Sequence, residues 1–104
     1  MLRTFAISIF ANIRQVDKFG RYGGEEFLLV LPDTAEDVAA RILDRLRRII
    51  GDLDWSAFSQ SMQVTISVGV AQLRPDETAD GLLARADRAL YKAKAEGRDR
   101  IAIA

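Results

Sequence analysis

The chain has 104 residues, 49% of them hydrophobic and 29% charged, a balance typical of a folded domain and unlike that of a disordered segment. It contains no cysteine and no histidine, which excludes a disulfide framework, a cysteine-based zinc site and catalysis by histidine. Fifteen basic and fifteen acidic residues cancel, and no apolar run approaches the length of a membrane span. No secretory signal follows Met1, so we expect a cytoplasmic protein.

The charges are unevenly distributed along the chain. Residues 1–22 and 85–100 are predominantly basic, whereas residues 23–37 carry five acidic side chains and no basic one. This arrangement suits either a polyanion held through a cation or ordinary solvated faces. No continuous basic surface laced with aromatic residues is visible, so we do not expect duplex nucleic acid as a partner.

The first third of the chain is predicted to form a helix and a hairpin. Apolar residues at helical spacing predict a helix over residues 2–14, ending near Arg14, although residues 5–10 also alternate as a strand does. Strands are predicted over 17–22 and 27–31. The Gly23–Gly24 pair between them indicates a β-hairpin, because glycines readily adopt the positive φ that tight turns require.

A second helix is predicted after Pro32. Thr34 and Asp37 stand at capping-box spacing, and Gly51 is a natural C-terminal cap. The side chains expected to form its buried stripe are Val38, Ile42, Leu46, Ile49 and Ile50.

The remaining segment is predicted to form a loop, a strand, a helix and a final strand. Trp55 and Phe58 are expected to anchor the loop over 52–62. Residues 64–71 alternate bulky with small side chains, which predicts a strand whose small-residue face admits a closely packed helix or, alternatively, a ligand. A helix is expected to stop at Gly97, followed by a strand over 100–103. The order describes one α/β domain without repeats or linkers.

The stretch most suggestive of chemistry is Arg21-Tyr22-Gly23-Gly24-Glu25-Glu26-Phe27. The two glycines allow the backbone to approach a phosphate closely, because no side chain obstructs it. Two adjacent carboxylates provide the oxygen ligands that a hard cation such as Mg²⁺ prefers. Taken alone, the same pattern also describes an ordinary hairpin tip.

The chain as a whole resembles the GGDEF domain of diguanylate cyclases. Residues 23–27 are the GGEEF form of that signature, and the blocks 28–34, 64–71 and 86–98 follow in family order. The resemblance implies an α/β (α+β) fold of the nucleotide-cyclase type, a ferredoxin-like antiparallel sheet with packed helices. It also implies an enzyme of bacterial second-messenger signalling that condenses two GTP molecules into cyclic di-GMP, with two domains facing one another.

The resemblance assigns roles at the signature. Glu25 matches the metal-binding carboxylate, with Mg²⁺ or Mn²⁺ as cofactor, and Glu26 the second catalytic acid. Gly23 and Gly24 would line the GTP phosphates.

Further residues match contacts outside the signature. Lys94 and Arg98 resemble the family's triphosphate contacts, although a solvated helix end explains two cations there equally well. Arg14 and Asp17 form the RxxD motif of the family's inhibitory cyclic di-GMP site, since an arginine fork binds phosphate and guanine edges. Arg45 matches a further arginine that some members use.

One part of the family pattern has no match. GGDEF domains begin with a strand bearing Asp-x-Asp-x-Phe-Lys, which supplies another metal carboxylate, followed by residues that read guanine. Residues 1–14 resemble the next helix instead. We therefore expect residues 1–104 to be a single partial domain, the C-terminal two-thirds, lacking the first strand and helix.

Three consequences are expected from that partial match. The Mg²⁺ site would be incomplete and the isolated chain would have negligible cyclase activity. Unpaired strand edges would favour a homo-oligomer or a strand-swapped dimer. The alternatives to the cyclase are a cyclic di-GMP-binding module working through Arg14 and Asp17, or a non-functional truncation.

Overall fold

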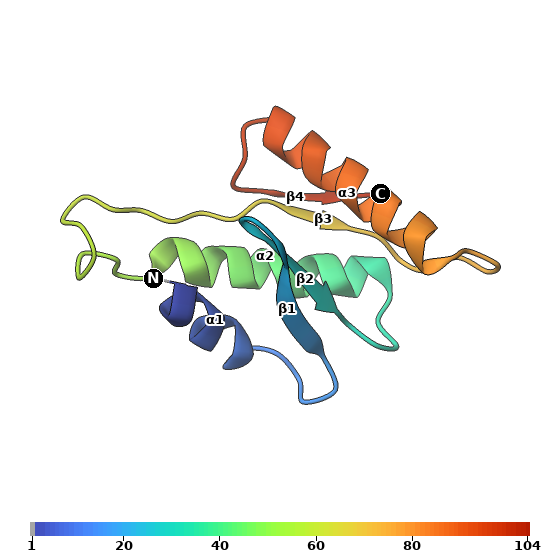
Figure 1. The fold of residues 1–104 in the computed structure, drawn as a ribbon, viewed down its shortest axis with the longest axis horizontal. Coiled ribbons are helices and arrows are strands. Elements are labelled where there is room, and N and C mark those ends of the chain that lie inside the picture. The colour runs from blue at the N-terminus through green and yellow to red at the C-terminus, as the bar shows by residue number, and fades with distance from the viewer. Residues whose placement is uncertain (1) are drawn as a thin grey trace. The chain divides into compact units, whose positions relative to one another are not determined.

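The computed structural model describes residues 2–104, which form three helices and four strands (Figure 1). In chain order these are α1 (Leu2–Phe10), β1 (Lys18–Gly23), β2 (Glu26–Val30), α2 (Glu36–Asp52), β3 (Val68–Val70), α3 (Ala79–Ala95) and β4 (Ile101–Ile103). The predicted mixture of helices and strands is confirmed. The chain divides into two compact units, Met1–Thr34 and Ala35–Ala104, and each is described by itself. Within residues 2–104 no helix combines the length and the apolar character needed to cross a membrane.

The first unit is a β-hairpin packed against a helix through aromatic rings. β1 and β2 pair antiparallel, as the glycine pair predicted, with Gly20 opposite Leu28. Phe19 stacks on Phe27 with ring centroids 5.3 Å apart. Phe5 of α1 lies 5.0 Å from Phe27 by the same measure. These ring contacts hold α1 to one face of the hairpin.

The helix α1 ends at Phe10, four residues before the predicted end. The backbone N–H of Arg14 donates to the carboxylate of Asp17 at 2.8 Å and therefore does not bond the carbonyl of Phe10. A side chain that captures a backbone donor in this way competes with the helix and ends it early.

The helix α2 has the predicted acidic first turn but not the predicted caps. Ala35 is the N-cap and makes no side-chain cap, so the capping box assigned to Thr34 is wrong. The Thr34 hydroxyl donates instead to the carbonyl of Pro32 at 2.9 Å. Gly51 lies inside the helix, whose C-cap is Leu53. Val38 is 38% exposed, so its assignment to the buried stripe is also wrong, whereas Leu46 and Ile50 are fully buried.

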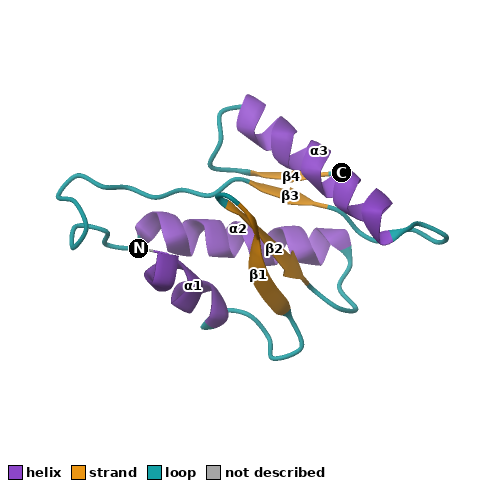
Figure 2. Ribbon diagram, viewed as in Figure 1, coloured by secondary structure: helices purple, strands orange, loops and turns teal. Residues whose placement is uncertain are grey.

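The second unit is built around a parallel pair of short strands. β3 pairs with β4, and the pair lies between α2 and α3 (Figure 2). Only the hairpin carries the antiparallel pairing expected for the sheet. The predicted strand over 64–71 forms ladder bonds only at Val68–Val70. Its partner cannot begin earlier, because Arg98 and Asp99 adopt left-handed φ values of 62° and 46° just before β4.

Close packing of α3 on β3 explains the small-residue face of that strand. A Cβ at Gly69 would clash with the backbone oxygen of Ala86 and the backbone nitrogen of Leu90. Ala102 of β4 is buried with Ala89 and Ala93 of α3. The predicted helix contact at this face is therefore confirmed, and any side chain at position 69 would push α3 away from the strand.

The loop between α2 and β3 has one of its two predicted anchors. Trp55 is fully buried and its indole N–H donates to the carbonyl of Ile50 at 3.2 Å. Phe58 is about half exposed, although its ring centroid lies 6.1 Å from that of Trp55. The loop is thus held to the end of α2 by the indole.

Candidate functional site

The hairpin tip presents the signature residues in open space. β1 ends at Gly23 and β2 begins at Glu26, with a register shift between Arg21 and Gly23. Gly24 has a φ of 53°, which glycine adopts without strain. A Cβ built on Gly23 or Gly24 would find no atom within 4 Å. The backbone of the tip is therefore accessible to a group as large as a phosphate.

The two carboxylates of the tip have the donor chemistry of a magnesium site. Glu25 is exposed and Glu26 half-buried. Mg²⁺ is usually held by one or two carboxylates together with waters and substrate phosphates, so this donor set fits the ion in the presence of a nucleotide. Across residues 2–104 no cluster of three or more ligating side chains occurs. The ion would thus be held by Glu25 with Glu26 beside it, and by oxygens that the substrate brings.

Arg21 braces this tip, a role that sequence reasoning did not assign. Its Nε and Nη2 both donate to the carbonyl oxygen of Gly24, at 2.9 and 2.7 Å. The contact spans the turn, from the last part of β1 to the residue before Glu25. Its only sequence signal is the arginine two positions ahead of the glycine pair.

Lys94 and Arg98 both lie at the C-terminal end of α3, where a phosphate-binding role was predicted. Gly97 adopts a φ of 122° and ends the helix. The N–H of Arg98 donates to the carbonyl of Ala93 at 3.0 Å, and that of Gly97 to the carbonyl of Lys94 at 3.4 Å, as in a Schellman motif. The predicted stop at Gly97 is confirmed, and Arg98 is exposed beyond it.

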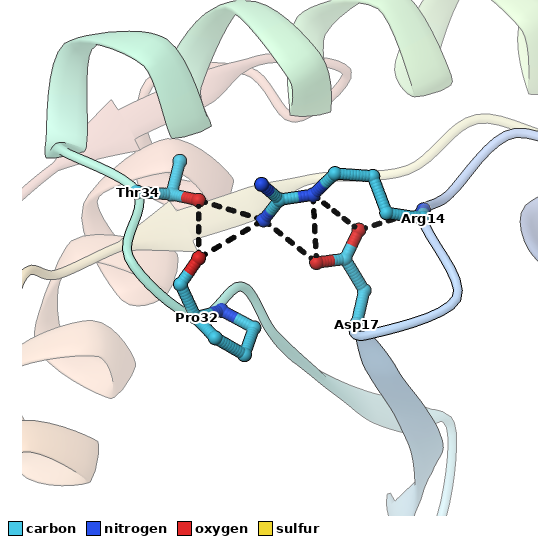
Figure 3. A network of polar contacts seen from close by, with 4 residues as sticks. All are labelled: Arg14, Asp17, Pro32 and Thr34. Carbon is cyan, nitrogen blue, oxygen red and sulfur yellow. Dashed lines mark hydrogen bonds and ion pairs between the residues drawn. The ribbon is translucent and has the colours of Figure 1, made fainter.

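Arg14 and Asp17 come together as a tight, bidentate ion pair (Figure 3). Arg14 Nη2 and Nε lie 2.8 and 3.1 Å from Asp17 Oδ1. Nη2 also donates to the Pro32 carbonyl at 3.1 Å and to the Thr34 hydroxyl oxygen at 2.7 Å. The network ties the loop before β1 to the loop after β2, and so closes the base of the hairpin.

Burial and charge in this network are asymmetric. The side chain of Asp17 is 1% exposed and that of Arg14 is 49% exposed. The guanidinium lowers the pKa of Asp17 by hydrogen bonding to its carboxylate, and Asp17 raises the pKa of Arg14 in return. The pair is therefore ionised at neutral pH, with its acid enclosed and its base facing water.

Arg45 lines an open groove between α2 and β4 of about 420 Å³. Arg41 and Arg48 share this helix face with it, since residues four and three apart are neighbours on a helix. Asp44 pairs with Arg48 at 2.7 Å, and the apolar wall comes from β4. The groove belongs to the second unit, together with Lys94 and Arg98, whereas the hairpin tip and the Arg14–Asp17 pair belong to the first.

A second arginine network, in the turn before α3, was not foreseen. Arg85 Nε and Nη2 each lie 2.7 Å from a carboxylate oxygen of Glu77, and Nη2 also donates to the carbonyl of Gln72. The side chains of Arg85 and Glu77 are 9% and 13% exposed. These hydrogen bonds lower the pKa of Glu77 to about 2. The network holds the turn over 72–78 against α3.

Comparison with known proteins places this geometry in a family context. A family model described as "Diguanylate cyclase, GGDEF domain" matches residues 1–100. The response regulator PleD of Caulobacter vibrioides is 39% identical over 104 residues, which cover 97% of this chain and 23% of PleD.

Two solved structures are similar over nearly the whole chain. The coiled coil and GGDEF domain of DgcB from Caulobacter crescentus, in complex with c-di-GMP, has a TM-score of 0.90 and 30% identity, covering 99% of this chain and 56% of that one. The active GGEEF domain of a diguanylate cyclase from Vibrio cholerae has a TM-score of 0.88 and 31% identity, covering 98% and 65%. The chain thus spans about a quarter of PleD and somewhat more than half of the solved chains.

Proposed function

Because the chain belongs to the diguanylate cyclase GGDEF domain family, we propose that it forms the signature-bearing part of a site that condenses two GTP molecules into cyclic di-GMP. In the proposed reaction the 3′-oxygen of each GTP bonds to the α-phosphorus of the other, and the bond to pyrophosphate breaks. Two pyrophosphates and the two hydroxyl protons leave. The symmetry of this exchange calls for two copies of the site, each presenting one GTP, and hence for a homodimer during turnover.

The observation that carries the proposal is the open Gly23–Gly24 tip followed at once by two carboxylates. The bare backbone of the tip accepts the phosphates at close range. Glu25 holds the metal-binding position and Glu26 the second acidic position. Bound Mg²⁺ or Mn²⁺ supplies charge neutralisation at the phosphates and a lower pKa for the attacking hydroxyl.

Lys94 and Arg98 of the second unit are proposed as further contacts with the triphosphate, as the family resemblance implies. Lys94 lies in the last turn of α3, and Arg98 is exposed beyond the helix. Their charge opposes the negative charge that pyrophosphate carries away, which stabilises the transition state of phosphoryl transfer.

The test is turnover of GTP by the full-length gene product, with product measured by chromatography. We expect Glu25→Gln to lower turnover by about 100-fold or more, the loss typical when a group that stabilises developing charge is removed. Asp52→Asn, the same change at an exposed position of α2, serves as the matched control and should leave turnover unchanged. Full turnover by Glu25→Gln would overturn the proposal. Parallel assay of the 104-residue chain tests the separate prediction that it turns over little GTP alone.

A second proposed function, cyclic di-GMP binding, is favoured by the Arg14–Asp17 network. The side chain of Arg14 is held in one orientation by three hydrogen-bonding partners, Asp17, Pro32 and Thr34, while half of it faces water. A guanidinium held in this way loses little conformational entropy when it binds a phosphate or a guanine edge. In the proposed function this fork meets the ligand and the enclosed Asp17 carboxylate orients it. Arg45, in the α2 groove of the second unit, is proposed as a further contact on the strength of the family resemblance.

Titration calorimetry with cyclic di-GMP tests this second function on the 104-residue chain. Arg14→Ala should weaken binding by roughly 10- to 100-fold, because charge-assisted hydrogen bonds are lost. Arg3→Ala removes an exposed arginine elsewhere in the first unit and should bind as the wild type does. Binding that survives Arg14→Ala would show that the RxxD motif is not the determinant.

A further inference from the structure

The glycine pair leaves the hairpin tip without packing support. Neither Gly23 nor Gly24 has any atom near the place of a Cβ, and glycine has the largest conformational freedom of all residues. The strand register also shifts just before the tip, between Arg21 and Gly23. A carboxylate on such a turn samples many positions unless something else fixes the backbone.

Arg21 supplies that constraint through one backbone oxygen. Its Nε and Nη2 converge on the Gly24 carbonyl at 2.9 and 2.7 Å. The carbonyl of Gly24 belongs to the peptide group that ends in the nitrogen of Glu25, and this group is planar. Fixing the oxygen therefore fixes the plane, and with it the direction in which the chain enters Glu25.

The contact leaves the acidic side chains available. Among the ion pairs of residues 2–104, none joins Arg21 to Glu25 or Glu26, although these carboxylates follow it by only four and five residues. A guanidinium that neutralised a carboxylate would compete with a metal ion for it. A guanidinium that donates to a backbone carbonyl shapes the turn and leaves both carboxylates available to a metal ion.

We propose that Arg21 is a positioning residue for the metal-holding carboxylate, acting through the Gly24 carbonyl to hold the Gly24–Glu25 peptide in the orientation that a metal–nucleotide complex requires. This inference rests on the proposed function of the tip. Arg21 itself touches neither the reacting atoms nor the metal. Its planar fork is what the role needs, because two nitrogens reach one oxygen from a fixed direction.

Two variants and a control separate positioning from charge. Arg21→Met removes both donors, and Arg21→Lys keeps the charge with a single nitrogen that reaches the oxygen. Lys18→Met removes a cation from the same strand without touching Gly24 and is the matched control. Folding of each variant is checked by circular dichroism.

Three readouts are measured on each protein: backbone order parameters at Glu25 and Glu26 by nuclear magnetic resonance, binding of Mn²⁺ in the presence of GTP by electron paramagnetic resonance, and turnover of GTP. For Arg21→Met we expect the order parameter at Glu25 to fall toward that of a flexible segment and Mn²⁺ binding to weaken by about 10-fold, since a charged hydrogen bond is lost. Turnover should fall with little change in KM for GTP. Arg21→Lys should recover part of each effect, and Lys18→Met should match the wild type.

The outcomes distinguish this inference from the function on which it rests. An unchanged order parameter and unchanged Mn²⁺ binding in Arg21→Met would overturn the positioning role whether or not the protein turns over GTP. Full recovery by Arg21→Lys would also overturn it, because charge alone would then suffice. If Glu25→Gln binds Mn²⁺ and turns over GTP normally, the proposed function fails, while the order parameter in Arg21→Met still reports whether Arg21 orders the turn.

Discussion

The two arginine networks of this chain share a plan and differ in their access to water. Arg14 and Arg85 each grip a carboxylate with two nitrogens and use Nη2 for a backbone carbonyl of a turn remote in sequence. The side chain of Arg14 is 49% exposed, whereas Arg85 and Glu77 are 9% and 13% exposed. The same chemistry therefore leaves a guanidinium open to water in one region and enclosed in the other, and the exposure of the arginine is the property that separates them.

The largest expected effect is the loss of stability on breaking the enclosed pair. Arg85→Met leaves the Glu77 carboxylate, whose side chain is only 13% exposed, without its partner, so we expect the melting temperature to fall by about 10 °C or more. The exposed Arg88 of the same helix gives the matched control, Arg88→Met. Thermal unfolding by circular dichroism measures both. Adding Glu77→Met to Arg85→Met should restore much of the lost melting temperature, because no unpaired carboxylate then remains. Equal melting temperatures for Arg85→Met and Arg88→Met would show that the enclosed pair contributes no more to stability than an exposed arginine does.

Acid should weaken the same pair without mutation. The pKa of Glu77 is lowered from 4.5 to about 2 by the hydrogen bonds from Arg85, so the pair contributes its full stability above pH 4.5. That contribution is lost progressively as the pH falls from 4.5 toward 2, because the unfolded chain takes up the proton first. Thermal unfolding across this range measures the slope. Glu77→Gln should flatten it, and an unchanged slope would contradict the lowered pKa.

At the Arg14–Asp17 pair, replacing the planar guanidinium by another cation should weaken ligand binding more than it lowers stability. Arg14→Lys keeps a cation but loses the planar fork, so cyclic di-GMP should bind about 10-fold more weakly in calorimetry. The melting temperature should change by only about 2–4 °C, since the lysine ammonium still faces the Asp17 carboxylate and only the planar fork is lost. If Arg14→Lys lowered the melting temperature as much as Arg85→Met does, the two networks would contribute equally to stability.

The smallest effect is expected at Thr34, whose hydroxyl supports Arg14 without capping α2. Thr34→Val removes that hydroxyl at constant shape and should weaken cyclic di-GMP binding by less than about 3-fold, because one neutral hydrogen bond is lost. Thr78→Val is the control, because Thr78 does cap a helix by accepting from Gly81 at 3.0 Å. It should cost about 1 kcal/mol, and Thr34→Val less, in thermal unfolding. A larger loss of stability for Thr34→Val than for Thr78→Val would support the capping role that the sequence predicted for Thr34.

Local sequence patterns correctly predicted the turns and helix ends that depend on the residue type at one position. The glycine pair placed the hairpin turn, and Gly97 placed the end of α3, because glycine adopts a positive φ without the strain that a side chain brings. The buried side of α2 was misplaced by one residue at its first turn. Ala39, Leu46 and Ile50 are the buried residues of the helix, so the buried stripe begins at Ala39 and Val38 lies beside it. Which of two neighbouring apolar residues is covered depends on how the helix packs, and the spacing of apolar residues alone does not determine this.

The candidate site likewise contains local contacts that the sequence could predict and long-range contacts that only the fold creates. Arg14 and Asp17 are three residues apart, so their pairing was open to sequence reasoning. The carbonyl of Pro32 and the hydroxyl of Thr34 reach Arg14 from 18 and 20 residues away, and only the fold of the hairpin brings them there. The sequence identified Arg21 as part of the signature, but its hydrogen bond to the carbonyl oxygen of Gly24 depends on the conformation of the turn.

The phosphate contact proposed for Arg98 would set stability against function at one position after α3. Arg98 and Asp99 hold left-handed conformations that cost a non-glycine residue of the order of 1 kcal/mol each, and Asp99 is anchored by Arg47 at 3.0 Å. A library of variants at position 98 selected only for thermal resistance should therefore enrich glycine and asparagine. The same library selected for GTP turnover should return arginine, so the two selections would diverge at this residue while agreeing on the rest of the loop.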